Sequence, residues 1–180
     1  MYFKEFEADD FEAIQAKLVP YVLSVCTDFT QFWNHIDVGE LLTSIPELES
    51  AIYQMTGQSP FRAYVLTVKD APLDVLDSKM NGNSLHRDTS KERYRLNWPI
   101  FNSASVETRF FTSDAEPTKL ILPTGQIYLR YTEEQCVFKD SNILSKPTLI
   151  DTYAIHGLYR RGTKFPRFVL SLNFEKDIHI

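Results

Sequence analysis

The chain has 180 residues, 43% of them hydrophobic and 24% charged, which is ordinary for one soluble globular domain spanning residues 1–180. Its net charge of -5 argues against a general nucleic-acid or anionic-membrane binder, and no apolar run approaches the ~20 residues that span a bilayer. Cys26 and Cys136 have no CxxC partner, which argues against a disulfide framework or a structural zinc site. The first residues also lack the apolar region of a secretory signal. We therefore expect a cytoplasmic protein with a single core.

Two helices are expected within residues 1–60, which we interpret as a helical support for the rest of the chain. The first covers residues 9–25, where apolar side chains recur at spacings of three and four, and Pro20 should end or kink it. The second begins at Pro46, a favourable first-turn residue, and Gly57 can close its end. Both apolar stripes are typical of helices that pack against a sheet.

After residue 60 the chain consists of short runs rich in Val, Ile, Thr and aromatic residues, separated by turn-forming residues. A tight hairpin turn is expected at Pro123, Thr124 and Gly125, and the loop at residues 70–83 is expected to be the most mobile segment. The pattern predicts a mainly β fold with flanking helices, a double-sheet jelly roll with helical support. Eight strands are expected, at residues 61–69, 84–88, 94–101, 106–112, 119–122, 126–131, 148–156 and 167–174.

His86 and Asp88 stand two residues apart in a strand-like segment. Successive side chains of a strand point to opposite faces, so these two share one face. Two histidines and one carboxylate form the facial triad that holds non-haem Fe(II) and leaves coordination positions open. The pair therefore predicts two of the three ligands of such a metal site.

The third ligand must come from the other histidines, which are His35, His156 and His179. The alternation of residues 148–156 puts His156 on one face of a strand, at its end and beside Gly157. His35 lies in an aromatic stretch that we interpret as helical and structural. His179 is expected to fray. We therefore predict that His156 completes the site.

The expected last strand has two distinct faces. Apolar residues that should pack outward against helices are Phe168, Leu170, Leu172 and Phe174, whereas the inward face carries Arg167, Val169, Ser171 and Asn173. An inward arginine is costly unless an anion meets it. A guanidinium grips a carboxylate through two parallel hydrogen bonds. The pattern predicts a diacid that chelates the metal at one end and meets Arg167 at the other.

The ordered set of His86-x-Asp88, His156 and, eleven residues later, Arg167 resembles the Fe(II)- and 2-oxoglutarate-dependent dioxygenases. Within that superfamily the short chain is similar to the aspartyl/asparaginyl hydroxylase-like and prolyl hydroxylase-like branches. The resemblance covers roughly residues 61–174, and it implies that they form the catalytic core as a double-stranded β-helix, a cupin-like jelly roll. It implies Fe(II) ligation by His86, Asp88 and His156, and a salt bridge from Arg167 to 2-oxoglutarate. The implied reaction hydroxylates a small molecule or a peptide side chain with molecular oxygen.

Four further residues are candidates for binding the cosubstrate. Tyr64 precedes the His-x-Asp segment and could offer its hydroxyl, with core packing as the alternative. Arg95 and Asn97 share one face of the next strand and could bind cosubstrate or substrate, although Arg95 could equally be a solvated charge or an ion-pair member. Ser171 shares the inward face of Arg167. Some branches place a serine two residues after the arginine, where this chain has Val169.

Two other functions remain open, a non-catalytic jelly-roll binding domain and a cupin-like metal enzyme that does not use 2-oxoglutarate. The His-Arg-Asp triplet also begins the catalytic loop of protein kinases, but Arg93 stands where that loop has asparagine, and there is no Gly-rich loop. A further group of basic residues could suggest phosphate binding, but we interpret it as a loop rim that attracts an acidic substrate or cosubstrate; it consists of Arg160, Arg161, Lys164 and Arg167.

Overall fold

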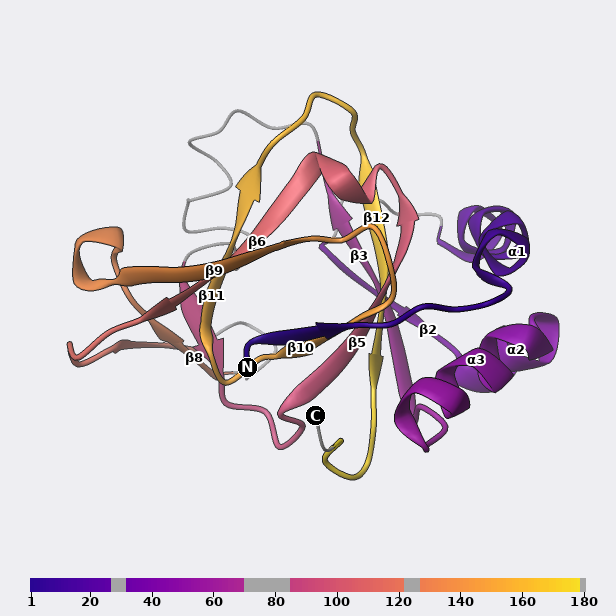
Figure 1. Ribbon diagram of the computed structural model, residues 1–180, viewed down its shortest axis with the longest axis horizontal. Coiled ribbons are helices and arrows are strands. Elements are labelled where there is room, and N and C mark those ends of the chain that lie inside the picture. Colours follow the sequence, from indigo (N-terminus) through magenta and orange to yellow (C-terminus); the bar gives the residue numbers. More distant parts are fainter. Residues whose placement is uncertain (27–31, 70–84, 122–126, 179–180) are drawn as a thin grey trace.

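The computed structural model describes residues 1–26, 32–69, 85–121 and 127–178. Within these ranges twelve strands form two six-stranded sheets, with three α-helices to one side (Figure 1).

One sheet, here called sheet A, contains β1 (Phe3–Glu5), β2 (Trp33–Ile36), β3 (Arg62–Val68), β5 (Tyr94–Phe101), β10 (Thr148–Asp151) and β12 (Arg167–Asn173). The other, sheet B, contains β4 (His86–Asp88), β6 (Val106–Thr112), β7 (Thr118–Ile121), β8 (Ile127–Arg130), β9 (Val137–Ile143) and β11 (Ile155–Arg160). The helices are α1 (Phe11–Val25), α2 (Val38–Ser44) and α3 (Pro46–Thr56), and two short 3₁₀ turns are η1 (Ser103–Ser105) and η2 (Glu133–Gln135).

The two sheets have the strand orders β1-β10-β5-β12-β3-β2 and β7-β8-β4-β11-β6-β9. Neighbours such as β12 and β3, or β11 and β6, pair antiparallel. Two antiparallel sheets of this kind, covered by helices on one side, confirm the predicted jelly-roll fold.

The helices cover the outer face of sheet A, at the right of Figure 1. Each fully buried aliphatic side chain there contributes about 1.5 to 3 kcal/mol. The outward face of β12 packs into this core as predicted. The packed residues include Ile14, Leu18 and Val22 of α1, Leu48 and Ile52 of α3, and Phe168, Leu170, Leu172 and Phe174 of the last strand and its end.

Of the two effects predicted for Pro20, ending the first helix is wrong, and a kink stays a prediction. α1 continues to Val25 and is capped by Cys26. A proline inside a helix removes one backbone hydrogen bond and costs about 3 kcal/mol. Leu18 and Val22 are both 0% exposed against sheet A, and their burial at about 1.5 to 3 kcal/mol each offsets that cost.

The region expected to be only helical also supplies strands. β1 pairs with β10 and β2 pairs with β3, so both extend the edges of sheet A. His35 therefore stands on a strand and not in the predicted helix, with its ring edge-on to that of Tyr64 at 5.6 Å. The prediction failed because β2 forms by pairing with β3, a contact that local sequence does not contain. β9 and α2 were likewise not predicted.

The strand expected at residues 148–156 is two strands in different sheets. β10 lies in sheet A and β11 in sheet B. Between them Asp151 Oδ1 accepts a hydrogen bond from the backbone N–H of Tyr153 at 3.0 Å, which is the side-chain mimic of a backbone turn. His156 is consequently the second residue of β11, and Gly157 lies inside that strand and does not end it.

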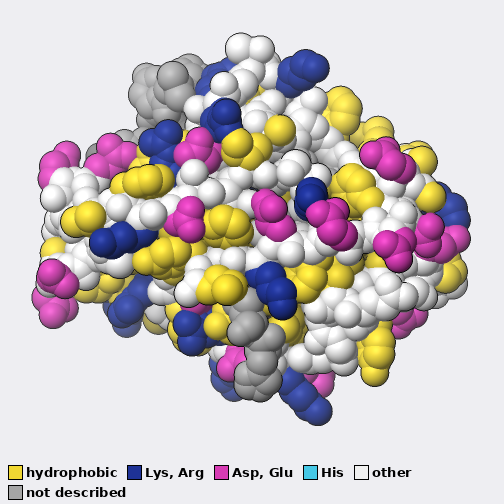
Figure 2. Space-filling model, in the orientation of Figure 1, with side chains coloured by type: hydrophobic (Ala, Val, Ile, Leu, Met, Phe, Trp, Pro, Cys, Tyr) yellow, Lys and Arg dark blue, Asp and Glu magenta, His cyan; other side chains and the backbone are white. Residues whose placement is uncertain are grey.

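Three predicted features lie outside the described residues: the hairpin turn at Pro123, Thr124 and Gly125, the loop at residues 70–83, and His179. The strands that flank the turn, β7 and β8, do pair antiparallel. In the described part of the chain no helix is long and apolar enough to cross a membrane. Acidic and basic side chains are interspersed over the face seen in Figure 2.

Gly57 ends α3 in the left-handed region, with a φ of 70°. A side chain built there meets no atom within 4 Å, so only backbone strain opposes it. Gly57→Ala should lower the free energy of unfolding by about 1 to 2 kcal/mol, measured by urea titration. Gly57→Asn should lose less, because asparagine tolerates this region better. An alanine variant as stable as the parent would contradict the prediction.

Candidate metal centre

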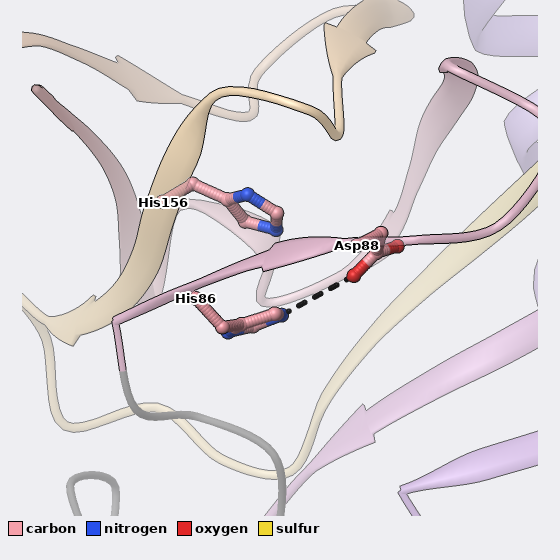
Figure 3. A group of neighbouring side chains, drawn as sticks. All are labelled: His86, Asp88 and His156. Atoms are coloured by element: carbon pink, nitrogen blue, oxygen red, sulfur yellow. Dashed lines mark ion pairs between the residues drawn. The ribbon is translucent and has the colours of Figure 1, made fainter. Parts of the chain in front are cut away.

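Strands β4 and β11 place His86 and His156 opposite each other. The two residues are Cα partners in the antiparallel pair, and their ring centroids lie 4.6 Å apart. Asp88 follows His86 by two residues, and both side chains are buried. One ligand atom from each of the three lies within 4.8 Å of the other two (Figure 3). The structure thus brings together the three residues that the sequence suggested as ligands, whereas His35 lies in sheet A.

The ring of His156 is oriented by a backbone contact. Its Nδ1 lies 2.9 Å from the carbonyl oxygen of Ala154. Because a carbonyl oxygen only accepts, Nδ1 carries a proton, and the neutral imidazole then has its lone pair on Nε2. This is the arrangement in which a metal-binding histidine is held by its other nitrogen.

The two oxygens of Asp88 have different neighbours. Oδ1 lies 3.5 Å from His86 Nε2, the contact drawn as a dashed line in Figure 3. Oδ2 accepts from Arg95 Nη2 at 2.8 Å, in an ion pair in which both side chains are buried. Arg95 is therefore a member of an ion pair, which is one of the roles predicted for it. Because Arg95 binds Oδ2, Oδ1 of Asp88 is the oxygen that faces the imidazoles.

Tyr128 belongs to this site although its sequence context did not suggest it. Its ring lies 4.5 Å from that of His86, and it is the Cα partner of Asp88 across β4 and β8. Burial raises the pKa of the Tyr128 hydroxyl, and the Asp88 carboxylate raises it further, so the hydroxyl stays protonated as a donor. The signal that could have found it is the strand register, which a single sequence does not give.

A cavity of ≈ 70 Å³ opens beside these residues. At about 10 to 15 Å³ for each water, it has room for about five to seven waters, or for an ion and a small organic ligand. Both sheets contribute to its wall. Among the described residues, Leu66, Ile150 and Leu158 make part of the wall apolar, while Arg95, Asn97 and Ser171 supply polar groups.

Asn97 and Ser171 are cross-strand partners on the sheet A side of this cavity. The Asn97 Oδ1 and Ser171 Oγ atoms are buried and have no hydrogen-bond partner in the ranges that the structure describes. Leaving a buried polar atom unpaired costs about 1 to 3 kcal/mol. Two such atoms on one cavity wall favour a site that is completed by a polar ligand.

Arg167 is buried at the start of β12, with 3% of its surface exposed. Its Nε donates to the Ser103 carbonyl oxygen over a long 3.4 Å. Burial lowers the pKa of the guanidinium to about 10, and among the described residues no carboxylate pairs with it. Arg167 is not among the described residues that line the cavity, to which β12 contributes Ser171. Within the described ranges, this buried positive charge on the inward face therefore has no counter-ion.

Tyr64 is the cross-strand partner of Ser171 on the other side of β12. Its ring packs edge-on against the rings of Trp33 at 5.4 Å and His35 at 5.6 Å. It is not among the described residues that line the cavity. These contacts match the packing interpretation, and a role in cosubstrate binding stays a prediction.

The donor set fits a divalent transition metal. Two imidazoles and one carboxylate oxygen on one side of an ion, with a cavity on the other, match the facial arrangement of non-haem Fe(II) sites. Within the described ranges no other group of three His, Cys, Asp or Glu residues comes together in this way.

Comparison with known proteins gives distant likenesses only. No family model matches the chain, and no curated protein matches it significantly. The chain is similar to acireductone dioxygenase from Bacillus anthracis, with a cadmium ion in its active centre, at 9% identity and a TM-score of 0.40 over 97% of this chain and 77% of the other. It is also similar to HygX from Streptomyces hygroscopicus, with nickel and 2-oxoglutarate bound. The sequence identity is 12% and the TM-score 0.41, over 95% of this chain and 80% of the other.

A third likeness is to SnoN, the non-heme alpha ketoglutarate dependent epimerase from nogalamycin biosynthesis, at 12% identity and a TM-score of 0.37 over 89% of this chain and 72% of the other. Likenesses this distant carry no argument about chemistry. The case for the site therefore depends on its own residues.

Proposed function

We propose that the chain is an Fe(II)- and 2-oxoglutarate-dependent oxygenase that hydroxylates a small molecule or a peptide side chain. The observation that carries the proposal is the convergence of His86, Asp88 and His156, from two paired strands, beside a cavity. Three protein ligands on one side of an ion leave positions open for a chelating cosubstrate and oxygen. The substrate class is limited by the small volume of the cavity to groups that enter as single side chains or small molecules.

In this proposal the metal is held by His156 Nε2, Asp88 Oδ1 and the imidazole of His86. When bound, metal and cosubstrate would supply oxygen activation, with one oxygen atom entering a substrate C–H bond and the other entering succinate as carbon dioxide leaves 2-oxoglutarate. The protein holds each ligand in place: Ala154 fixes the His156 tautomer, and Arg95 occupies the second oxygen of Asp88.

The cosubstrate is assigned to the inward face of sheet A. Counting partners among the described residues only, Asn97 and Ser171 offer unpaired polar atoms near the metal ligands, and Arg167 offers an unpaired charge further along β12. Arg167 and Ser171 are four residues apart, which is roughly 13 Å of strand. A five-carbon diacid and an extended arginine side chain together can span that length.

The apolar part of the cavity wall has a separate role. Leu66, Ile150 and Leu158 keep bulk water from the open coordination positions. Exclusion of water protects reactive species from side reactions and strengthens the polar contacts inside.

A metal enzyme of the same fold that does not use 2-oxoglutarate is the second candidate. It is favoured by one observation, the absence of Arg167 from the cavity wall among the described residues. The two candidates differ in whether the metal and 2-oxoglutarate bind together.

Cosubstrate binding and turnover test the proposal. Under anaerobic conditions, Fe(II) plus 2-oxoglutarate should give a weak visible charge-transfer band, and admission of air should convert 2-oxoglutarate to succinate. The matched control omits Fe(II) and should give neither. Metal binding without the band and without succinate would support the second candidate and contradict the first.

A further inference from the structure

Asp88 and Arg95 form a buried ion pair beside the three candidate ligands. Arg95 Nη2 lies 2.8 Å from Asp88 Oδ2, and the side chains are 10% exposed for Arg95 and 3% for Asp88. Of the described residues that line the cavity, Asp88 carries the one carboxylate and Arg95 the one guanidinium. Because water is largely excluded, the two charges are compensated mainly by each other. The charges of Asp88 and Arg95 therefore cancel before any ligand enters the cavity.

A divalent cation alone would disturb this balance. Asp88 Oδ1 remains able to bind it, but Arg95 stays at Oδ2, so the cation lies close to a guanidinium in a buried site. A charge of +2 about 6 Å from the single positive charge of the guanidinium, at an effective dielectric constant of about 20, weakens binding by roughly 10,000-fold before solvent screening reduces the effect. A dianion bound with the cation offsets this repulsion, since the charges of Asp88, Arg95, cation and dianion sum to zero. The protonated Arg167 favours the dianion further.

Arg95 is held in place on the cavity side. Its guanidinium carbon lies 5.2 Å from the centroid of the Trp33 ring, so the side chain is packed as well as paired. Its Nε is buried and has no hydrogen-bond partner in the described part of the chain. An anion in the cavity would satisfy this remaining donor, and charge-assisted hydrogen bonds of that kind are the strong ones.

We infer that Arg95 makes divalent-metal binding depend on a dianionic ligand, so that the site binds the metal weakly by itself and cooperatively with a small dicarboxylate. The inference rests on the proposed function, because the dianion is a chelating cosubstrate of the 2-oxoglutarate type. Arg95 acts on the metal through Asp88 and offers its Nε to the dianion. Metal and dianion raise each other's affinity by the same factor, because coupling between two sites is reciprocal.

The test is titration of the apo-protein with Mn(II), with and without saturating 2-oxoglutarate, followed by the electron paramagnetic resonance signal of free Mn(II). In the parent protein the dianion should raise the Mn(II) affinity by at least about 10-fold. Arg95→Gln is neutral but keeps a donor for Asp88, and it should bind Mn(II) alone at least about 10-fold more tightly than the parent. Its coupling to the dianion should fall. Arg95→Lys keeps the charge and should behave like the parent.

Arg93→Gln is the matched control. Arg93 also pairs with a buried aspartate, Asp151, at 2.7 Å, but it does not line the cavity. This variant should show the Mn(II) affinity and coupling of the parent. A purely structural role for Arg95 predicts the opposite sign, because a disordered Asp88 would bind metal more weakly.

Mn(II) binding to Arg95→Gln that is equal to or weaker than binding to the parent would overturn the inference while leaving the proposed function intact. No Mn(II) binding by parent and variant alike would instead overturn the proposed function, and the inference with it. If Arg95→Gln does not fold, the parent protein is titrated with Mn(II) in the presence of pyruvate, and the result is compared with that for 2-oxoglutarate. Pyruvate has the same chelating head as 2-oxoglutarate but one charge fewer, and equal coupling by the two acids would contradict the inference.

Discussion

His156→Gln should lower the affinity for Mn(II) or Fe(II), measured with 2-oxoglutarate present, by at least about 100-fold. Loss of a group that only orients a ligand already costs 10- to 100-fold, and His156 is placed as a ligand by its Nε2. Glutamine preserves the polarity and much of the length of the side chain but offers a weakly donating amide. The fold should persist, because among the described residues the imidazole makes a single hydrogen bond, to the carbonyl oxygen of Ala154.

His35→Gln is the control for this substitution. His35 also stands on a strand with its ring against an aromatic side chain, Tyr64, but in sheet A and outside the cluster. It should leave metal affinity unchanged, with circular dichroism verifying that both variants are folded. Equal metal affinity in His156→Gln and His35→Gln would remove His156 from the site, and with it the proposed facial set.

Alternation in the sequence was sufficient to predict the faces of β12. Phe168, Leu170 and Leu172 enter the helix-covered core, while Ser171 faces the cavity. This worked because a strand buried on both sides still has a side-chain period of two, and because the polar residues interrupt only one face. The same periodicity put His86 and Asp88 on one face of β4, where the structure has both of them buried.

Partners across strands could not be predicted in the same way. The pairing of His86 with His156, of Asp88 with Tyr128 and of Asp88 with Arg95 depends on register between distant segments. One sequence contains no measure of that register. The change of sheet between β10 and β11 was missed for a related reason: the alternation continues through the turn, and only the contact of Asp151 with the following backbone marks it.

Replacement of Arg167 should change both the stability of the protein and its binding of 2-oxoglutarate. Burial holds the pKa of its guanidinium near 10, so at pH 7 the group remains protonated and the folded protein carries the full cost of the buried charge, on the order of 3 kcal/mol. This cost to the stability of the folded protein is complete below the folded pKa of Arg167, and it disappears only as pH rises above about 10. Replacement by an uncharged side chain of similar volume should therefore stabilise the apo-protein.

Arg167→Met should raise the free energy of unfolding of the apo-protein by about 1 to 3 kcal/mol, because the substitution removes the cost of the buried charge. Saturating 2-oxoglutarate with Mn(II) should stabilise the parent according to the ratio of ligand concentration to Kd, and should stabilise the variant far less. Thermal unfolding of both proteins, with and without the ligands, measures the two effects together. Arg109→Met removes a half-exposed arginine that is paired with Glu107 and should gain no stability. A variant that is less stable than the parent without ligand, yet equally stabilised by 2-oxoglutarate, would show that Arg167 has a partner within the protein and does not meet the cosubstrate.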